Sequence, residues 1–131
     1  MLVLKEGTQM SQTKYNENHK QILDKILLKN PEVKPGKMFG FPAYYVGGKL
    51  FACIYENGVG LKVPEPRVNE LRGQPHIEYF QPLGRKKMRE WVQINRENSE
   101  YYVKDKEILF EALEYVASIA GITFDSNKTN S

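Results

Sequence analysis

The residues best suited to chemistry form a basic stretch with aromatic neighbours in the second half of the chain. Its members are Arg85, Lys86, Lys87, Arg89 and Trp91. Such a group could contact phosphates and stack on bases, which is the chemistry of nucleic-acid binding. It could equally face a protein partner, since arginine and tryptophan are enriched in protein interfaces. A plainer interpretation is a solvated hairpin whose cations pair with acids of the last helix.

The second candidate is Cys53, the only cysteine of the chain. A single cysteine excludes an internal disulfide and any Cys-x-x-Cys site. A reactive thiol needs exposure and a nearby cation, and a hairpin turning at Asn57-Gly58 would place Lys62 opposite Cys53. A thiol-dependent enzyme or sensor is therefore an alternative function, although we expect a buried and inert cysteine on a central strand.

No other constellation points to catalysis or to a metal. His19 falls on an apolar helical stripe and His76 stands in a loop or strand start, and neither has a second histidine nearby in the sequence. The glycine pair Gly47-Gly48 belongs to a hairpin rather than to a phosphate-binding loop. We therefore expect no catalytic residues, no cofactor and no metal site.

The elements that would position these residues can be read from apolar periodicity and turn signals. A first helix is expected to start near Tyr15 and to end at Asn30-Pro31, and a short helix is expected over 66–72. The expected strands are a three-stranded meander over 43–63 with turns at Gly47-Gly48 and Asn57-Gly58, then 77–80 and 87–94. A polar loop over 95–99 and a last helix over 105–121 complete the order.

Alternation within the strands predicts which side chains share a face. In the central strand we expect Leu50, Ala52 and Ile54 on one face and Phe51, Cys53 and Tyr55 on the other. In the strand 87–94 the pattern directs Val92 and Ile94 to the core and Arg89 and Trp91 the opposite way, so that face is expected to be the functional surface. The residues expected to be buried under the two long helices are Ile22, Ile26, Leu109, Leu113 and Val116.

These elements predict an α+β domain with an antiparallel sheet of about five strands and the N- and C-terminal helices packed on it. The length of 131 residues and a hydrophobic content of 40% suit one domain. The expected boundaries are a flexible N-terminal tail over 1–12, the domain over 13–121 and a C-terminal tail over 122–131.

Charge and hydropathy limit the cellular setting. The net charge of +3 is too small to indicate nucleic acid alone. Its distribution is uneven, because the segment from Asp105 onward holds more acids than bases and leaves a basic body before it. No stretch resembles a signal peptide or reaches the length of a membrane span, so we expect a soluble, cytoplasmic protein without membrane contact.

Four blocks of the sequence resemble the TfoX/Sxy N-terminal-domain family in order and in spacing. These blocks are Lys37–Tyr44, Gly47–Cys53, Leu61–Glu65 and Pro82–Val92. The resemblance covers about residues 34 to 120 and implies a compact α+β fold similar in shape to MmcQ/YjbR-like proteins. The family's namesakes regulate natural competence and carry a second, helical domain, whereas these blocks belong to the first. It implies no catalytic residues.

The interpretation that combines these features is a non-catalytic binding or regulatory module of this family. Its expected partner is a protein, or a second copy of the chain, bound through Arg89, Trp91 and the neighbouring strand surface. Nucleic-acid binding through the basic residues 85–89 is the first alternative, and thiol chemistry at Cys53 is the second.

Overall fold

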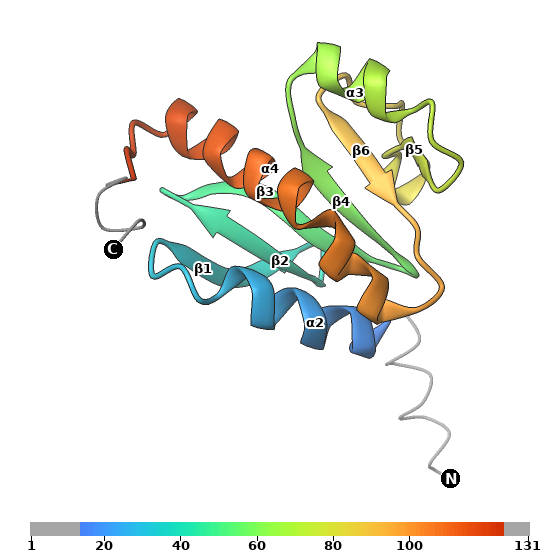
Figure 1. The fold of residues 1–131 in the computed structure, drawn as a ribbon, viewed down its shortest axis with the longest axis horizontal. Coiled ribbons are helices and arrows are strands. Elements are labelled where there is room, and N and C mark those ends of the chain that lie inside the picture. The colour runs from blue at the N-terminus through green and yellow to red at the C-terminus, as the bar shows by residue number, and fades with distance from the viewer. Residues whose placement is uncertain (1–13, 125–131) are drawn as a thin grey trace, which may run out of the picture.

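The computed structural model describes residues 14–124 as an antiparallel sheet with helices packed on it (Figure 1). The predicted N-terminal tail over 1–12 lies outside this range, as does the chain from residue 125. The elements are α2 (Glu17–Leu27), β1 (Val33–Met38), β2 (Phe41–Val46), β3 (Lys49–Tyr55), β4 (Gly58–Lys62), α3 (Glu65–Leu71), β5 (Ile77–Tyr79), η1 (Pro82–Gly84), β6 (Trp91–Ile94), η2 (Ser99–Asp105) and α4 (Lys106–Ile119).

The six strands run in the order β1-β2-β3-β4-β6-β5, and every neighbouring pair is antiparallel. The α+β class predicted from the sequence is confirmed. The additional strand is β1, an edge strand that contains Pro35 and Gly36. An edge position tolerates proline because one side of the strand needs no hydrogen-bonding partner.

The meander β2-β3-β4 forms as predicted, but its second turn lies one residue earlier than expected. The first turn is Gly47-Gly48, with φ of 58° and 77°, the left-handed angles that a tight hairpin requires. At the second turn Tyr55 pairs with Gly58, so the loop residues are Glu56 and Asn57 rather than Asn57 and Gly58. Every pair of β3 with β4 shifts accordingly.

A register irregularity alters the faces predicted for β3. Tyr45 pairs with Leu50 and Tyr44 pairs with Ala52, which leaves Phe51 as an extra residue in β3. A bulge of this kind breaks the period-two alternation at that point. Phe51 therefore packs in the core beneath the helices and Leu50 packs with the cluster on the other face, the reverse of the assignment expected for these two residues. The other four residues of β3 with predicted faces lie on those faces: Ala52, Ile54, Cys53 and Tyr55.

Helices α2 and α4 lie over one face of the sheet and cover the main core (Figure 1). Helix α2 starts where the side chain of Asn16 accepts hydrogen bonds from the N–H groups of Asn18 and His19, an N-cap that satisfies two free donors. Of the five residues predicted to be buried under the two long helices, four are buried and Ile22 is only half-buried. Beyond α4, Ile122 and Phe124 also pack against this core.

The strand predicted over 87–94 is shorter than expected, because β6 begins at Trp91. At the start of β6, Trp91 pairs with Lys62, the final residue of β4. Val92 pairs with Tyr79, the final residue of β5. Pro64 has no N–H group to extend the first ladder, and β5 is only three residues long. Residues 85–90 therefore form an irregular loop that carries the basic stretch. No helix in the described range is long and apolar enough to cross a membrane.

Candidate anion-binding site

The basic loop rests on a second apolar cluster, on the face of the sheet away from α2 and α4. The buried members of this cluster are Phe41, Ala43, Cys53, Tyr55, Phe80 and Trp91. Phe80 precedes the loop and Trp91 follows it, and their ring centroids lie 5.4 Å apart. The side-chain oxygen of Tyr55 accepts a hydrogen bond of 2.8 Å from the Leu83 N–H. Both ends of the loop, and one residue within the turn before it, are thus fixed to the sheet.

Trp91 belongs to this second core and is 6% exposed. The prediction that it points away from Val92 and Ile94 is correct, since those residues lie in the main core. The expectation that it forms part of an accessible binding surface is wrong, because Phe80 and its neighbours cover the ring. Period-two geometry gives the direction of a side chain but does not say whether another segment covers it.

The four predicted cations remain accessible. Arg85, Lys86, Lys87 and Arg89 are all exposed, and within residues 14–124 none lies within ion-pair distance of a carboxylate. The predicted ion pairs between these cations and the acidic helix α4 do not form. Glu111 of α4 forms an ion pair instead with Arg67 of α3. The charges of the loop are therefore available to a ligand.

The one acid within this stretch, Glu90, faces away from the cations. Its carboxylate accepts a 2.7 Å hydrogen bond from the Tyr115 hydroxyl and lies 3.3 Å from the Lys62 ammonium. These contacts, the hydrogen bond from Tyr115 foremost, hold the pKa of Glu90 below its ordinary value. The Glu90 carboxylate is therefore bound to side chains of α4 and β4, and it does not pair with the four cations of the loop.

Three of the four cations converge on a hollow of about 440 Å³ between the loop, α3 and β5. We call it the basic hollow; its lining residues are Glu65, Asn69, Tyr79, Lys86, Lys87 and Arg89. The lining contains three positively charged side chains, from Lys86, Lys87 and Arg89, and one carboxylate, from Glu65. This excess of positive charge favours an anion, which could also accept a hydrogen bond from the Asn69 amide. The sequence reasoning did not include Glu65 and Asn69, because only the fold brings α3 beside the loop.

Two of the four loop cations, Arg85 and Lys87, each lie over an aromatic ring. The Lys87 ammonium lies 4.1 Å and the Arg72 guanidinium 3.8 Å from the centroid of the Tyr79 ring. The Arg85 guanidinium lies 4.9 Å from the centroid of Phe39, at the turn between β1 and β2. Cation–π contacts of this length are attractive and restrict the side chains without neutralising their charge. Arg85 thus lies beside the hollow rather than in it.

The thiol candidate has neither condition that reactivity requires. Cys53 is 0% exposed, and burial raises the pKa of its thiol to about 12. The residue opposite it is Gly60 and not Lys62, a consequence of the earlier turn at Glu56. The β3–β4 pairing therefore places no cation opposite the thiol to favour the thiolate.

His19 has hydrogen-bond partners for both of its ring nitrogens. His19 is fully buried, with Nε2 3.1 Å from the Asn57 carbonyl and Nδ1 2.6 Å from the Ser99 hydroxyl. A carbonyl only accepts, so Nε2 carries the proton and Nδ1 accepts from Ser99 in the neutral ring. Across the described part of the chain, no three His, Cys, Asp or Glu side chains are grouped to hold a metal ion.

Compared with known proteins, the chain matches no family model, no curated protein and no solved structure. Inference about function therefore rests on the chemistry of the basic hollow and on the accessible surfaces around it.

Proposed function

We propose that the protein is a non-catalytic binding module that holds a phosphate-bearing ligand, foremost nucleic acid, on the loop 85–89. The observation that supports this most is the convergence on the basic hollow of three exposed cations that form no ion pair within residues 14–124. Lysine and arginine side chains neutralise the phosphates of nucleic acids, and such backbone contacts need no base recognition. Arg85, beside the hollow, is placed to contact a neighbouring phosphate.

A protein partner on this surface has less support. That hypothesis relied on Trp91 as an aromatic anchor beside Arg89, and the tryptophan is buried. Without Trp91 the surface offers mainly long charged side chains. Lysine, which supplies two of them, is depleted in the centres of protein interfaces. A thiol-based enzyme has the least support, because Cys53 is inaccessible and its protonated form is favoured.

We also propose a relationship to the TfoX/Sxy N-terminal domains, supported by the four sequence blocks. In the fold these blocks cover the β1–β2 turn, strand β3, the end of β4 and the basic loop with β6. The last block contains all four exposed cations, so the resemblance includes the surface to which we assign binding.

The test is equilibrium binding of a fluorescently labelled oligonucleotide, followed by anisotropy between about 50 and about 200 mM salt. Each cation that contacts a phosphate contributes roughly 0.7 to 0.9 to the slope of log K against log salt. Removing two cations in the Lys86→Ala/Lys87→Ala variant should therefore lower the slope by about 1.4 to 1.8. Arg89→Ala should lower it by about half as much.

The matched control is Lys34→Ala/Lys49→Ala, which removes the same charge from exposed positions on β1 and at the start of β3. It should leave the slope nearly unchanged. Equal losses in the two double variants would mean that only net charge matters, and would contradict the assignment. Absence of binding at the lowest salt concentration would contradict the proposed ligand class.

A further inference from the structure

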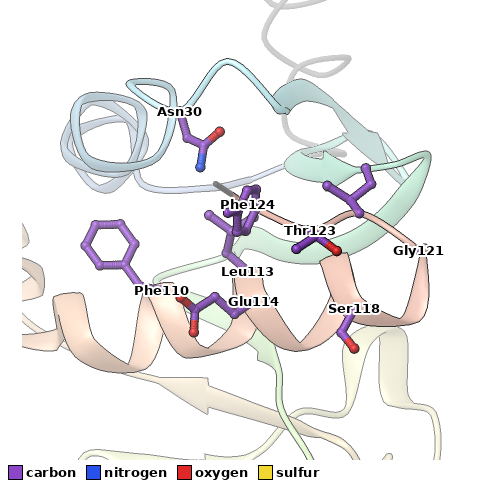
Figure 2. A pocket seen from close by; sticks show the side chains of 9 residues that line it. Asn30, Phe110, Leu113, Glu114, Ser118, Gly121, Thr123 and Phe124 are labelled. Carbon is purple, nitrogen blue, oxygen red and sulfur yellow. The ribbon is translucent and has the colours of Figure 1, made fainter. Parts of the chain in front are cut away.

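The helical face contains two hollows that share no lining residue with the basic hollow. A hollow of about 220 Å³ is lined by residues of both α2 and α4. A larger hollow of about 730 Å³ lies between α4, the segment 121–124 that follows it and Asn30, beyond the end of α2. Phe110 of α4 lines both hollows, so they adjoin the same side chain. Figure 2 shows Phe110, Leu113 and Glu114 along α4, with Asn30, after the end of α2, above them in the view. We call these two hollows together the helix groove.

The floor of the helix groove is apolar and accessible. Phe110 is 41% exposed and Val103 is 46% exposed, and both line the smaller hollow together with Ile22 and Ile26. Ile22 is the residue that sequence periodicity assigned to the core and that the fold leaves half-buried. Clustered exposed apolar side chains in a groove are typical of interaction sites.

The rim of the groove is basic, and α4 itself carries a complementary stripe. Lys25, Lys29 and Lys106 line the smaller hollow, and none is within ion-pair distance of a carboxylate in the described chain. On α4, Glu107 and Glu114 are exposed three residues before and four residues after Phe110. Residues at these spacings share one helical face. This face of the molecule therefore holds an aromatic residue between two acids on α4, and apolar residues between lysines in the smaller hollow.

We propose that the helix groove binds a second copy of this chain through a two-fold interface. Phe110 of each copy enters the groove of the other, and Glu107 and Glu114 face Lys25 and Lys29 across the interface. Such an interface is self-complementary, so both halves of the contact are present on one chain. The proposal is independent of the phosphate-binding function, because the two surfaces share no residue.

The oligomeric state tests this proposal directly. Sedimentation equilibrium of the full chain from about 1 to about 500 μM should give a reversible monomer–dimer equilibrium. Phe110→Gln, which keeps helix-forming character, should weaken the dimer roughly tenfold or more, as removal of an aromatic anchor does. Phe39→Gln is the matched control, since Phe39 is 54% exposed at a distant turn and should leave the dimer unchanged. A monomer throughout this range, or a dimer insensitive to Phe110→Gln, overturns the proposal.

A charge exchange gives a second test that does not depend on the aromatic variant. Lys25→Glu/Lys29→Glu should be monomeric alone, and so should Glu107→Lys/Glu114→Lys, because each places like charges across both halves of the interface. An equimolar mixture of the two should associate, since each half then joins opposite charges. A mixture that remains as monomeric as its components would overturn the assignment of this face.

Discussion

Substitution of Gly60 by alanine should destabilise the second core on which the basic loop rests. A Cβ atom at this position would lie 3.0 Å from Phe80 Cζ and 3.1 Å from Cys53 Sγ. Both neighbours are buried, so they cannot simply move into solvent. Overpacking by one methyl group in such a core costs about 1 to 3 kcal/mol. For a domain of this size that corresponds to a fall in Tm of roughly 4 to 12 °C.

Thermal unfolding of Gly60→Ala, followed by circular dichroism, measures this cost, and a double-mutant cycle assigns its cause. Phe80→Leu removes the ring atoms that the new methyl group would meet, so Gly60→Ala should cost less by about 0.5 kcal/mol or more in that background. Gly73→Ala is the control, because its nearest contact would be an ordinary 3.6 Å to the Glu70 carbonyl. A Gly60→Ala variant as stable as the parent, or a cost unaffected by Phe80→Leu, would refute the packing described here.

Three further predictions concern burial. Leu113→Ala should lower the free energy of unfolding by about 2 to 5 kcal/mol in chemical denaturation, since the side chain is buried under α4; an unchanged midpoint would mean that the helix is not docked. Burial lowers the pKa of His19 from 6.5, so the folded protein favours the neutral ring. The free energy of unfolding should therefore be constant above pH 6.5 and should fall as the pH drops from 6.5 through the lowered pKa. A His19→Gln variant should lose less of its free energy of unfolding over the same pH range. Cys53 should react with a thiol reagent, and Trp91 should be quenched by iodide, only after denaturant unfolds the chain.

Much of the sheet follows from local signals, and its errors have local causes. The glycines at 47 and 48 fix the first hairpin because few other residues adopt their backbone angles. At the second hairpin the Asn57-Gly58 pair is equally suggestive, yet Glu56 takes a φ of 51° and the turn forms one residue earlier. The backbone N–H of Asn16 donates to the Glu56 carbonyl at 2.9 Å, a long-range contact that sequence periodicity does not reveal.

The candidate site was predicted in part, because its residues come from two separate segments. The cations of the loop are adjacent in sequence and could be recognised as a group. The α3 residues Glu65 and Asn69 and the burial of Trp91 depend on how α3 and Phe80 pack, which sequence alternation does not determine. The same limit applies to Ile22, whose place on the apolar stripe is correct while its exposure depends on the separation of α2 from α4.

The second core has a consequence for binding at the loop. Residues 85–90 lack a regular hydrogen-bond ladder, and a loop of this kind would ordinarily lose conformational entropy when it binds a ligand. Here Phe80 and Trp91 fix its two ends, and the cation–π contacts at Tyr79 and Phe39 restrict two of its side chains. Part of the ordering cost is therefore met during folding rather than during binding. The aromatic residues that appeared to be a recognition surface thus act beneath the charges, where they hold the cations in the arrangement that an anion would meet.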